Sequence, residues 1–231
     1  MAAKLRIGFV LFPGITQLDF TGPYEVVARV PELDVVTVAK TMEPVRSEFG
    51  LSFLPDVDFG SAPQLDILCV PGGSGIVAAA SDAETIGFLQ TRAASARYLT
   101  SVCTGSLLLG AAGLLKGYHA TTHWLSLDLL KLVGAIPVRE RIVKDRNRIT
   151  GGGITSGMDF GFALAAEVAG RETAERVQLV MEYDPAPPFN SGNPETADRS
   201  LVETVTEERA ALQAERRKFF EGLSLSLDAR G

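Results

Sequence analysis

The 231-residue chain contains only two cysteines, two histidines and one tryptophan. The two cysteines, Cys69 and Cys103, are too few for the disulfide framework of a small secreted protein. The N-terminal residues lead into a short apolar segment that stops at Phe12-Pro13-Gly14, without the long apolar core or small-residue cleavage site of a signal peptide. These absences predict a cytoplasmic protein whose thiols are reduced.

Long uncharged segments are also scarce. The run between Arg97 and Lys116 carries no charge, but it is barely long enough to cross a bilayer and it contains three Gly and four Ser/Thr. A buried strand followed by a helix is therefore the better interpretation. A net charge of −6 argues against nucleic acid or an anionic membrane as a partner.

Cys103 lies inside this uncharged run, between a predicted strand at Tyr98–Val102 and a predicted helix that begins at Gly105. A nucleophile at a sharp strand-to-helix turn needs small neighbours, because the backbone is strained and the side chain must stand clear. The positive end of the following helix is expected to stabilise a thiolate. Cys103 is thus our candidate nucleophile, although an isolated cysteine is more often a buried core residue. We assign that core role to Cys69.

Predicted strands and helices alternate along the chain, which indicates an open α/β sheet with helices on both faces. Runs such as Leu5–Leu11 are continuously apolar, as in strands buried on both faces of a parallel sheet. Ligands of such sheets bind beyond the carboxyl ends of the strands. Candidate site residues follow predicted strands at Asp19, Pro71-Gly72-Gly73, Cys103 and Gly151-Gly152-Gly153. We expect these positions to converge on one rim of the sheet.

Ordinary structural roles compete at some of these positions. Asp19 could simply be the N-cap of a helix. The turn Pro71–Gly75 could be a plain tight turn or an anion or oxyanion cradle. His119 and His123 are four residues apart, but the Thr pair between them favours a strand, so we predict no metal site. His123 is instead a candidate cap for a helix over Trp124–Val133.

The C-terminal part differs in composition. A proline-rich loop over Asp184–Asn193 separates a predicted main domain, residues 1–183, from an appendage to the same domain, residues 184–231. The final helix is predicted at about Ala197–Glu221. Its apolar stripe consists of Leu201, Val205, Leu212 and Phe219. Such a stripe is more typical of a docking surface than of a ligand site.

Several motifs together resemble one branch of the ThiJ/PfpI superfamily of class I glutamine-amidotransferase-like proteins. They are Phe12–Gly14 with Leu18–Pro23, Val102–Gly105, Ala120–Trp124 and Ile149–Asp159. The resemblance covers about Leu5 to Met181. It implies an α/β fold, a flavodoxin-like three-layer sandwich with a mostly parallel sheet and a nucleophile-elbow cysteine. The branch comprises isonitrile hydratases and the sensor domains of AraC-type regulators.

The same resemblance implies a set of site residues. Cys103 takes the place of the nucleophile, Asp19 that of the acidic residue that contacts it, and Thr104 that of the residue after the nucleophile. Four further positions are expected to bind substrate: Gly72 and Gly73 as backbone donors beside the sulfur, and Gly152 and Ile154 in the turn that packs over the thiolate. Two anions in one pocket repel, so Asp19 is expected to be shifted toward its protonated form.

The implied activity is that of an isonitrile hydratase, a hydro-lyase. Cysteine attack on an isocyanide gives a thioimidate, and water then releases an N-substituted formamide. No cofactor is needed, and the expected partners are a small-molecule isonitrile and a second copy in a homodimer. Two alternatives stay open, a ligand-sensing domain and a glyoxalase- or deglycase-like enzyme. Proteases, deglycases and glyoxalases of the superfamily commonly carry His after the cysteine and Glu as the acid, where this chain has Thr104 and Asp19.

Overall fold

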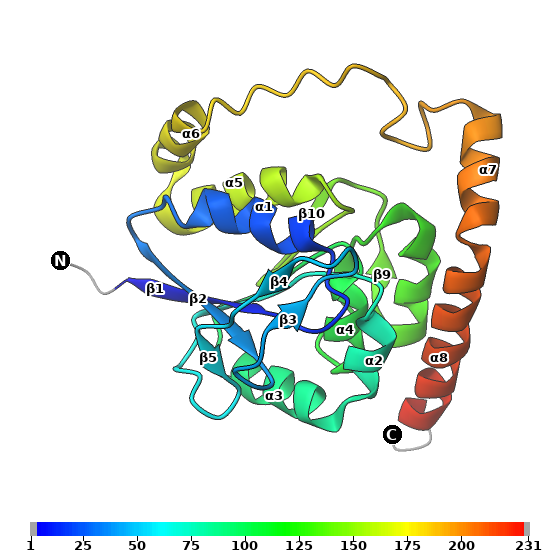
Figure 1. Ribbon diagram of the computed structural model, residues 1–231, viewed down its shortest axis with the longest axis horizontal. Helices are drawn as coiled ribbons and strands as arrows, with labels where there is room; N and C mark the ends of the chain where they lie inside the picture. The colour runs from blue at the N-terminus through cyan, green and yellow to red at the C-terminus, as the bar shows by residue number, and fades with distance from the viewer. Residues whose placement is uncertain (1–3, 229–231) are drawn as a thin grey trace.

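The structure, a computed structural model, describes residues 4–228 and their side chains as far as Leu225. Its centre is a seven-stranded sheet (Figure 1). In spatial order the strands are β10 (Ile142–Asp145), β11 (Arg148–Gly151), β7 (Tyr98–Val102), β6 (Ile67–Val70), β1 (Leu5–Val10), β2 (Leu33–Ala39) and β5 (Val57–Asp58). Every neighbouring pair is parallel except β10 and β11, so the predicted mostly parallel sheet is confirmed.

Helices cover both faces of this sheet and complete the three-layer sandwich (Figure 1). One face carries α1 (Gln17–Val27), α5 (Ser156–Ala169) and α6 (Arg171–Val180). The other carries α2 (Ile76–Ser81), α3 (Ala83–Ala93), α4 (Gly105–Ala111) and the 3-10 helix η1 (Trp124–Val133). Two short strand pairs lie outside the main sheet. One is the hairpin of β3 (Val45–Arg46) with β4 (Ser52–Phe53), and the other is β8 (His119–Ala120) with β9 (Ile136–Pro137).

Strand β6 shows why the central segments are apolar throughout. Successive side chains of a strand point to opposite faces, so Ile67 and Cys69 enter one apolar cluster and Leu68 and Val70 the other. All four side chains are fully buried. A strand with helices on both faces therefore needs an unbroken apolar run, and Cys69 is a core residue as expected.

The C-terminal segment forms two helices rather than the single predicted one. Helix α7 (Arg199–Glu208) ends at Arg209, and α8 (Ala210–Asp228) continues beyond the predicted end. Helix α8 packs against η1, and its Phe220 is fully buried in the core on that face of the sheet. The helices thus stand along one side of the sandwich (Figure 1). The division into residues 1–183 and 184–231 stays a prediction.

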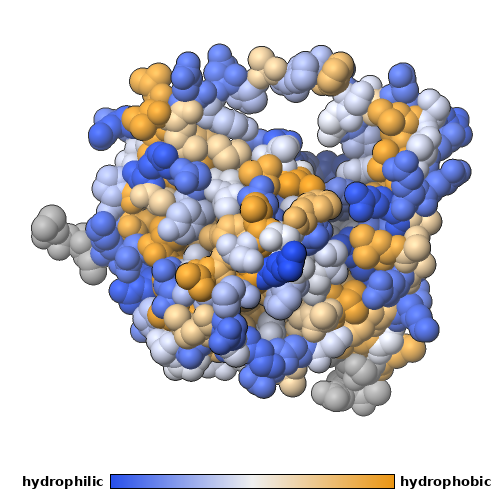
Figure 2. All heavy atoms as spheres, viewed as in Figure 1, coloured by the Kyte–Doolittle hydropathy of each residue, from blue (hydrophilic) through white to orange (hydrophobic). Residues whose placement is uncertain are grey.

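The surface mixes polar and apolar residues over the face that Figure 2 shows. Hairpin β3–β4 and its flanks carry three exposed large apolar side chains, Phe49, Leu51 and Leu54. Within residues 4–228, no helix has the length and apolar character needed to cross a membrane.

Candidate active site

Cys103 occupies the sharp turn between β7 and α4 with a left-handed backbone, φ +55°. A non-glycine residue in this region is strained and persists only where its surroundings hold it. Its N–H donates to the carbonyl oxygens of Gly151 and Gly152 at 3.0 and 2.9 Å. Its carbonyl oxygen accepts from Thr122 Oγ1 at 2.8 Å and from Ser106 Oγ at 3.1 Å. These four bonds fix the predicted elbow, and Cys103 as a whole residue is 5% exposed.

Two glycines allow the turns at this rim to approach one another closely. A Cβ on Gly105 would stand 1.9 Å from the carbonyl oxygen of Val70, so only glycine lets α4 begin against the end of β6. A Cβ on Gly72 would lie 2.5 Å from the Thr104 nitrogen and 3.0 Å from Asp19 Oδ2. The turn after β6 therefore meets both the nucleophile turn and helix α1.

Asp19 lies in the first turn of α1, which begins at Gln17 with Thr16 at the N-cap position. The N-cap interpretation of Asp19 is therefore wrong, because the helix starts two residues before it. The Asp19 side chain is fully buried, and its Oδ2 accepts the Gly72 N–H at 3.2 Å. Its Oδ1 has no hydrogen-bond partner of ordinary geometry among the described residues. A buried oxygen of this kind is costly unless the site uses it.

The protonation of Asp19 follows from its burial. Desolvation raises the pKa of Asp19 to about 8, with a further increase from Glu48, while contacts with the Cys103 thiol and the Gly72 N–H lower it by less. The carboxyl is therefore mostly protonated at pH 7. This is the direction that the sequence predicts, although the main cause is desolvation rather than a neighbouring thiolate.

The thiol of Cys103 is not acidic at rest. Desolvation raises its pKa well above the usual value, and Asp19 raises it further. The Thr104 N–H and Arg216 act in the opposite direction but do not outweigh burial. The expectation of a thiolate stabilised by the helix alone is therefore wrong for the resting site. Cys103 and Asp19 form a buried pair that is predominantly neutral at pH 7.

The backbone N–H groups of the glycine turn after β6 donate to side chains of the protein itself. The Gly72 N–H is taken by Asp19, and the Gly73 N–H donates to Thr104 Oγ1 at 3.1 Å. Thr104 is 1% exposed. The two N–H groups that we expected to face a substrate therefore hold the acidic residue and the residue after the cysteine in place.

A cavity of about 220 Å³ opens over Cys103. Of the other predicted site residues, Gly73, Thr104 and Ile154 line it. Gly72 lies behind this lining and contacts Asp19, whereas Gly152 lines an adjacent depression and accepts the Cys103 N–H. The structure thus brings all seven predicted positions to one rim of the sheet, but only part of them into the cavity.

One wall of the cavity comes from the C-terminal helices, which sequence reasoning did not place in the site. The residues of this wall are Val205, Arg209, Leu212, Gln213 and Arg216. Two positions of the predicted docking stripe, Val205 and Leu212, thus also line the cavity, which the sequence did not predict. A signal for Arg216 existed in the sequence, because this charged residue lies one helical turn from both Leu212 and Phe220 on the buried face of α8.

His123 also lines the cavity and caps η1, as predicted, by accepting the Leu125 N–H on Nδ1 at 3.4 Å. Burial, followed by the positive charges of Arg216 and Arg209, lowers the pKa of His123 to about 4. This imidazole is therefore neutral at pH 7 and adds no charge to the site.

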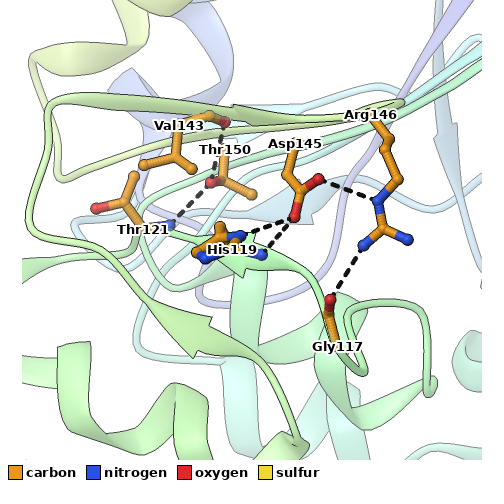
Figure 3. A network of polar contacts seen from close by, with 7 residues as sticks. All are labelled: Gly117, His119, Thr121, Val143, Asp145, Arg146 and Thr150. Atoms are coloured by element: carbon orange, nitrogen blue, oxygen red, sulfur yellow. Dashed lines mark hydrogen bonds and ion pairs between the residues drawn. The ribbon is translucent and has the colours of Figure 1, made fainter.

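His119 serves a different part of the fold. Its N–H and Nδ1 lie 2.8 and 3.1 Å from Asp145 Oδ2, while Asp145 Oδ1 accepts from Arg146 Nε at 3.0 Å (Figure 3). Arg146 in turn donates to the carbonyl oxygen of Gly117 at 3.0 Å. These bonds join β8 to β10. In the part of the chain that the structure describes, no group of three or more His, Cys, Asp or Glu side chains could hold a metal ion.

A flavodoxin-like sandwich with a cysteine at a strained strand-to-helix turn, beside a buried carboxyl, defines a class of cysteine-elbow α/β proteins. The DJ-1/PfpI family matches residues 5–167, and the chain belongs to this family.

Three relatives show the extent of the similarity. The chain is 50% identical to the isonitrile hydratase of Pseudomonas putida over 98% of its own length and 99% of that protein. It is 31% identical to the HTH-type transcriptional regulator GbdR of Pseudomonas aeruginosa, over 77% of this chain but only 50% of the regulator. Among solved structures, a ThiJ/PfpI family protein from Pseudomonas syringae superposes with a TM-score of 0.91 at 45% identity, over 96% of this chain and 91% of that chain.

Proposed function

We propose that the protein is an isonitrile hydratase, a hydro-lyase that adds water to an isocyanide and releases an N-substituted formamide. The observation that carries this proposal is the 50% identity to an isonitrile hydratase over nearly the whole of both chains. The buried pair of Cys103 and Asp19 supports it, because the reaction needs a soft nucleophile and a proton carrier in one place.

The first half of the reaction forms the thioimidate. The reactive form of the pair holds one proton, with Cys103 as thiolate and Asp19 as carboxylic acid. Ionisation of Asp19, whose pKa is about 8, removes the other proton in about one molecule in ten at pH 7, and transfer of the Cys103 proton to Asp19 then gives this reactive form. The thiolate attacks the terminal isonitrile carbon, and Asp19 delivers its proton to the same carbon, where attack builds negative charge. The product is R–N=CH–S–Cys103, with Asp19 left as carboxylate.

The second half hydrolyses this intermediate. The Asp19 carboxylate accepts a proton from water while the water oxygen bonds to the thioimidate carbon, and Asp19 then passes this proton to the nitrogen, which gives R–NH–CH(OH)–S–Cys103. Cleavage of the carbon–sulfur bond, with transfer of the hydroxyl proton to Asp19, then releases R–NH–CHO and restores the Cys103 thiolate and the Asp19 carboxylic acid. One water is consumed and no electrons are transferred, so no cofactor is required by this chemistry.

The remaining predicted residues have supporting roles in this proposal. Gly72 holds the Asp19 carboxyl, and Gly73 holds the Thr104 side chain beside the nucleophile. Gly152 anchors the backbone of Cys103, and Ile154 forms part of the apolar surface that receives the substituent of the substrate.

We further propose a cytoplasmic homodimer that acts on a small-molecule isonitrile and has no nucleic-acid partner. The net charge of −6 disfavours binding to a polyanion. The exposed apolar side chains of Phe49, Leu51 and Leu54 provide a surface suited to contact with a second copy. Light scattering is expected to give the dimer mass, and a purely monomeric mass at micromolar concentration would contradict this assembly.

Incubation with a simple alkyl isonitrile tests the activity, with formamide followed by NMR. We expect catalytic turnover in the parent, loss of turnover in Cys103→Ala with the fold retained, and near-parental turnover in Cys69→Ala. Cys69 is the matched control, because it is the other cysteine and lies wholly in the core. Unchanged turnover in Cys103→Ala would exclude Cys103 as the nucleophile.

A ligand-sensing role is the second candidate, because the matched regulator shares this domain over half of its own length. A sensor would bind isonitriles or other small ligands stoichiometrically and form no product. A glyoxalase is distinguished by methylglyoxal, from which robust lactate formation would displace the hydratase assignment.

A further inference from the structure

Arg216 on α8 is a buried cation that forms no ion pair with a carboxylate among the residues that the structure describes. It is 6% exposed, its Nη2 donates to the carbonyl oxygen of Gly73 at 2.9 Å, and its Nη1 lies 3.4 Å from Ser126 Oγ. Its Nε has no hydrogen-bond partner among the described residues. Burying a guanidinium that is bonded only to neutral oxygens is costly, and removing it from water needs compensation by a nearby negative charge.

The geometry points to Cys103 as the residue whose negative charge, when the thiol ionises, compensates the charge of Arg216. Arg216 and Cys103 line the same cavity. A short path of contacts also joins them, since Arg216 holds the Gly73 carbonyl, the Gly73 N–H holds Thr104 Oγ1, and Thr104 follows Cys103 in the chain. Among the groups that favour the charged form of Arg216, Cys103 is the largest, ahead of Glu48 and Glu215.

The other charged groups near the thiol do not supply a stable counter-ion for a thiolate. Asp19 is an acid and raises the pKa of Cys103. Glu48, which also lines the cavity, is an acid and raises the pKa of Asp19. His123 is neutral at pH 7, because its pKa is about 4. Arg209 lines the cavity but is exposed to solvent, so its charge is screened. Arg216 is thus the buried cation of the described site.

We propose that Arg216 is a positioning residue for the nucleophile, whose guanidinium compensates the charge of the Cys103 thiolate and holds the Gly73 turn against Thr104. The residue lies outside the segment 5–167 that the family match covers, so the C-terminal helix adds this function to the family core. The role of a thiolate in turnover rests on the proposed function, but the charge compensation itself does not.

Alkylation of the thiol tests the proposal without any isonitrile. The rate of reaction with iodoacetamide is measured from pH 6 to 11 on the folded full-length protein, with Cys103→Ala as the blank for Cys69. We expect Arg216→Met to raise the apparent pKa of alkylation by about 1 or more, the usual effect of removing an opposite charge next to a thiolate. Arg216→Lys keeps the charge and should move the profile by less than half as much.

Arg217→Met is the matched control, because Arg217 is the next residue on α8, is half exposed and, within the described part of the chain, forms an ion pair with Glu221 alone, at 3.9 Å. Its alkylation profile should coincide with that of the parent. If Arg216→Met does not fold, Arg216→Gln replaces it as a smaller neutral side chain. A parental profile in the folded neutral variant, or equal displacement in the Met and Lys variants, would overturn the proposal. Absence of isonitrile turnover in a parent with the expected profiles would count against the hydratase alone.

Discussion

The N–H of Gly72 donates to Oδ2 of Asp19 at 3.2 Å, and this bond joins the turn after β6 to the first turn of α1. It fixes one carboxyl oxygen of Asp19 and leaves the other, Oδ1, buried and without a hydrogen bond of ordinary geometry in the described part of the chain. The carboxyl is therefore oriented but keeps one oxygen for proton transfer.

Replacement of Asp19 by Asn should lower turnover strongly while the fold is retained. Asn has the shape of the neutral carboxylic acid that predominates at pH 7, and its amide oxygen can still accept the Gly72 N–H. We expect the free energy of unfolding of Asp19→Asn to stay within about 1 kcal/mol of the parent at about pH 4, before ionisation of the unfolded chain favours unfolding of the parent, which is the scale of one hydrogen bond. Turnover should fall by roughly two orders of magnitude or more, because an amide does not carry the proton.

Formamide production followed by NMR at pH 7 measures the activity, and urea unfolding at about pH 4 measures the stability. Asp19→Glu is the comparison variant, with the same acid on a longer stem, and should keep part of the activity. Near-parental turnover in Asp19→Asn would show that Asp19 is not the residue that transfers the proton.

Stability should depend on pH through the same carboxyl. The pKa of Asp19 is about 8 in the folded chain against an ordinary value of 3.8, so between these values the folded state holds a proton that the unfolded state has lost. Its contribution to stability is fully present below about pH 4 and is lost as the pH rises toward 8. The slope reaches up to about 1.4 kcal/mol per pH unit.

The control is Asp19→Asn, which cannot titrate at this position. Urea unfolding of both proteins at pH 5, 6 and 7 should give a parent that loses stability relative to the variant with each step. A constant difference between the two proteins would show that the Asp19 carboxyl is already ionised in the folded state.

Gly72→Ala should damage the site at a point where three segments of the chain approach one another closely. The added Cβ would stand 2.5 Å from the Thr104 nitrogen and 2.6 Å from Thr104 Oγ1, both in the turn that carries Cys103. We expect destabilisation by about 1–3 kcal/mol, the usual cost of overpacking, together with lost turnover. Gly87→Ala is the control, since Gly87 lies within α3 with nothing within 4 Å of its Cβ, and should stabilise the chain by about 0.5–1 kcal/mol. Similar unfolding curves for the two variants would contradict this close approach.

The wall formed by α7 and α8 should select the substrate. Leu212→Phe places a larger side chain in the cavity of about 220 Å³ over Cys103. We expect KM for a bulky aryl isonitrile to rise by about tenfold or more, and KM for methyl isonitrile to change far less. Leu201→Phe is the control, because Leu201 belongs to the same stripe but is half exposed and lies outside this cavity. If the two variants change KM equally for both substrates, the C-terminal helices do not select the substrate.

Local patterns in the sequence were sufficient for the sheet and for the position of the nucleophile turn. The run Tyr98–Val102 is a strand, and Cys103 stands at the left-handed turn before α4, because β-branched and small residues impose these conformations over short distances. The cap of η1 by His123 was predicted for the same reason. Candidate positions after the strands converge, because the carboxyl ends of parallel strands share one rim.

The electrostatics of the site were decided only by tertiary structure. No local pattern distinguishes an N-cap aspartate from one three positions into a helix, yet the second arrangement buries Asp19 and raises its pKa to about 8. The same burial keeps Cys103 a thiol, against the effect of the helix that the sequence suggests. Arg216 enters the cavity only because α8 packs across η1, far along the chain from the cysteine. Desolvation and charge pairing depend on contacts between distant segments, so they arise only when the chain is folded.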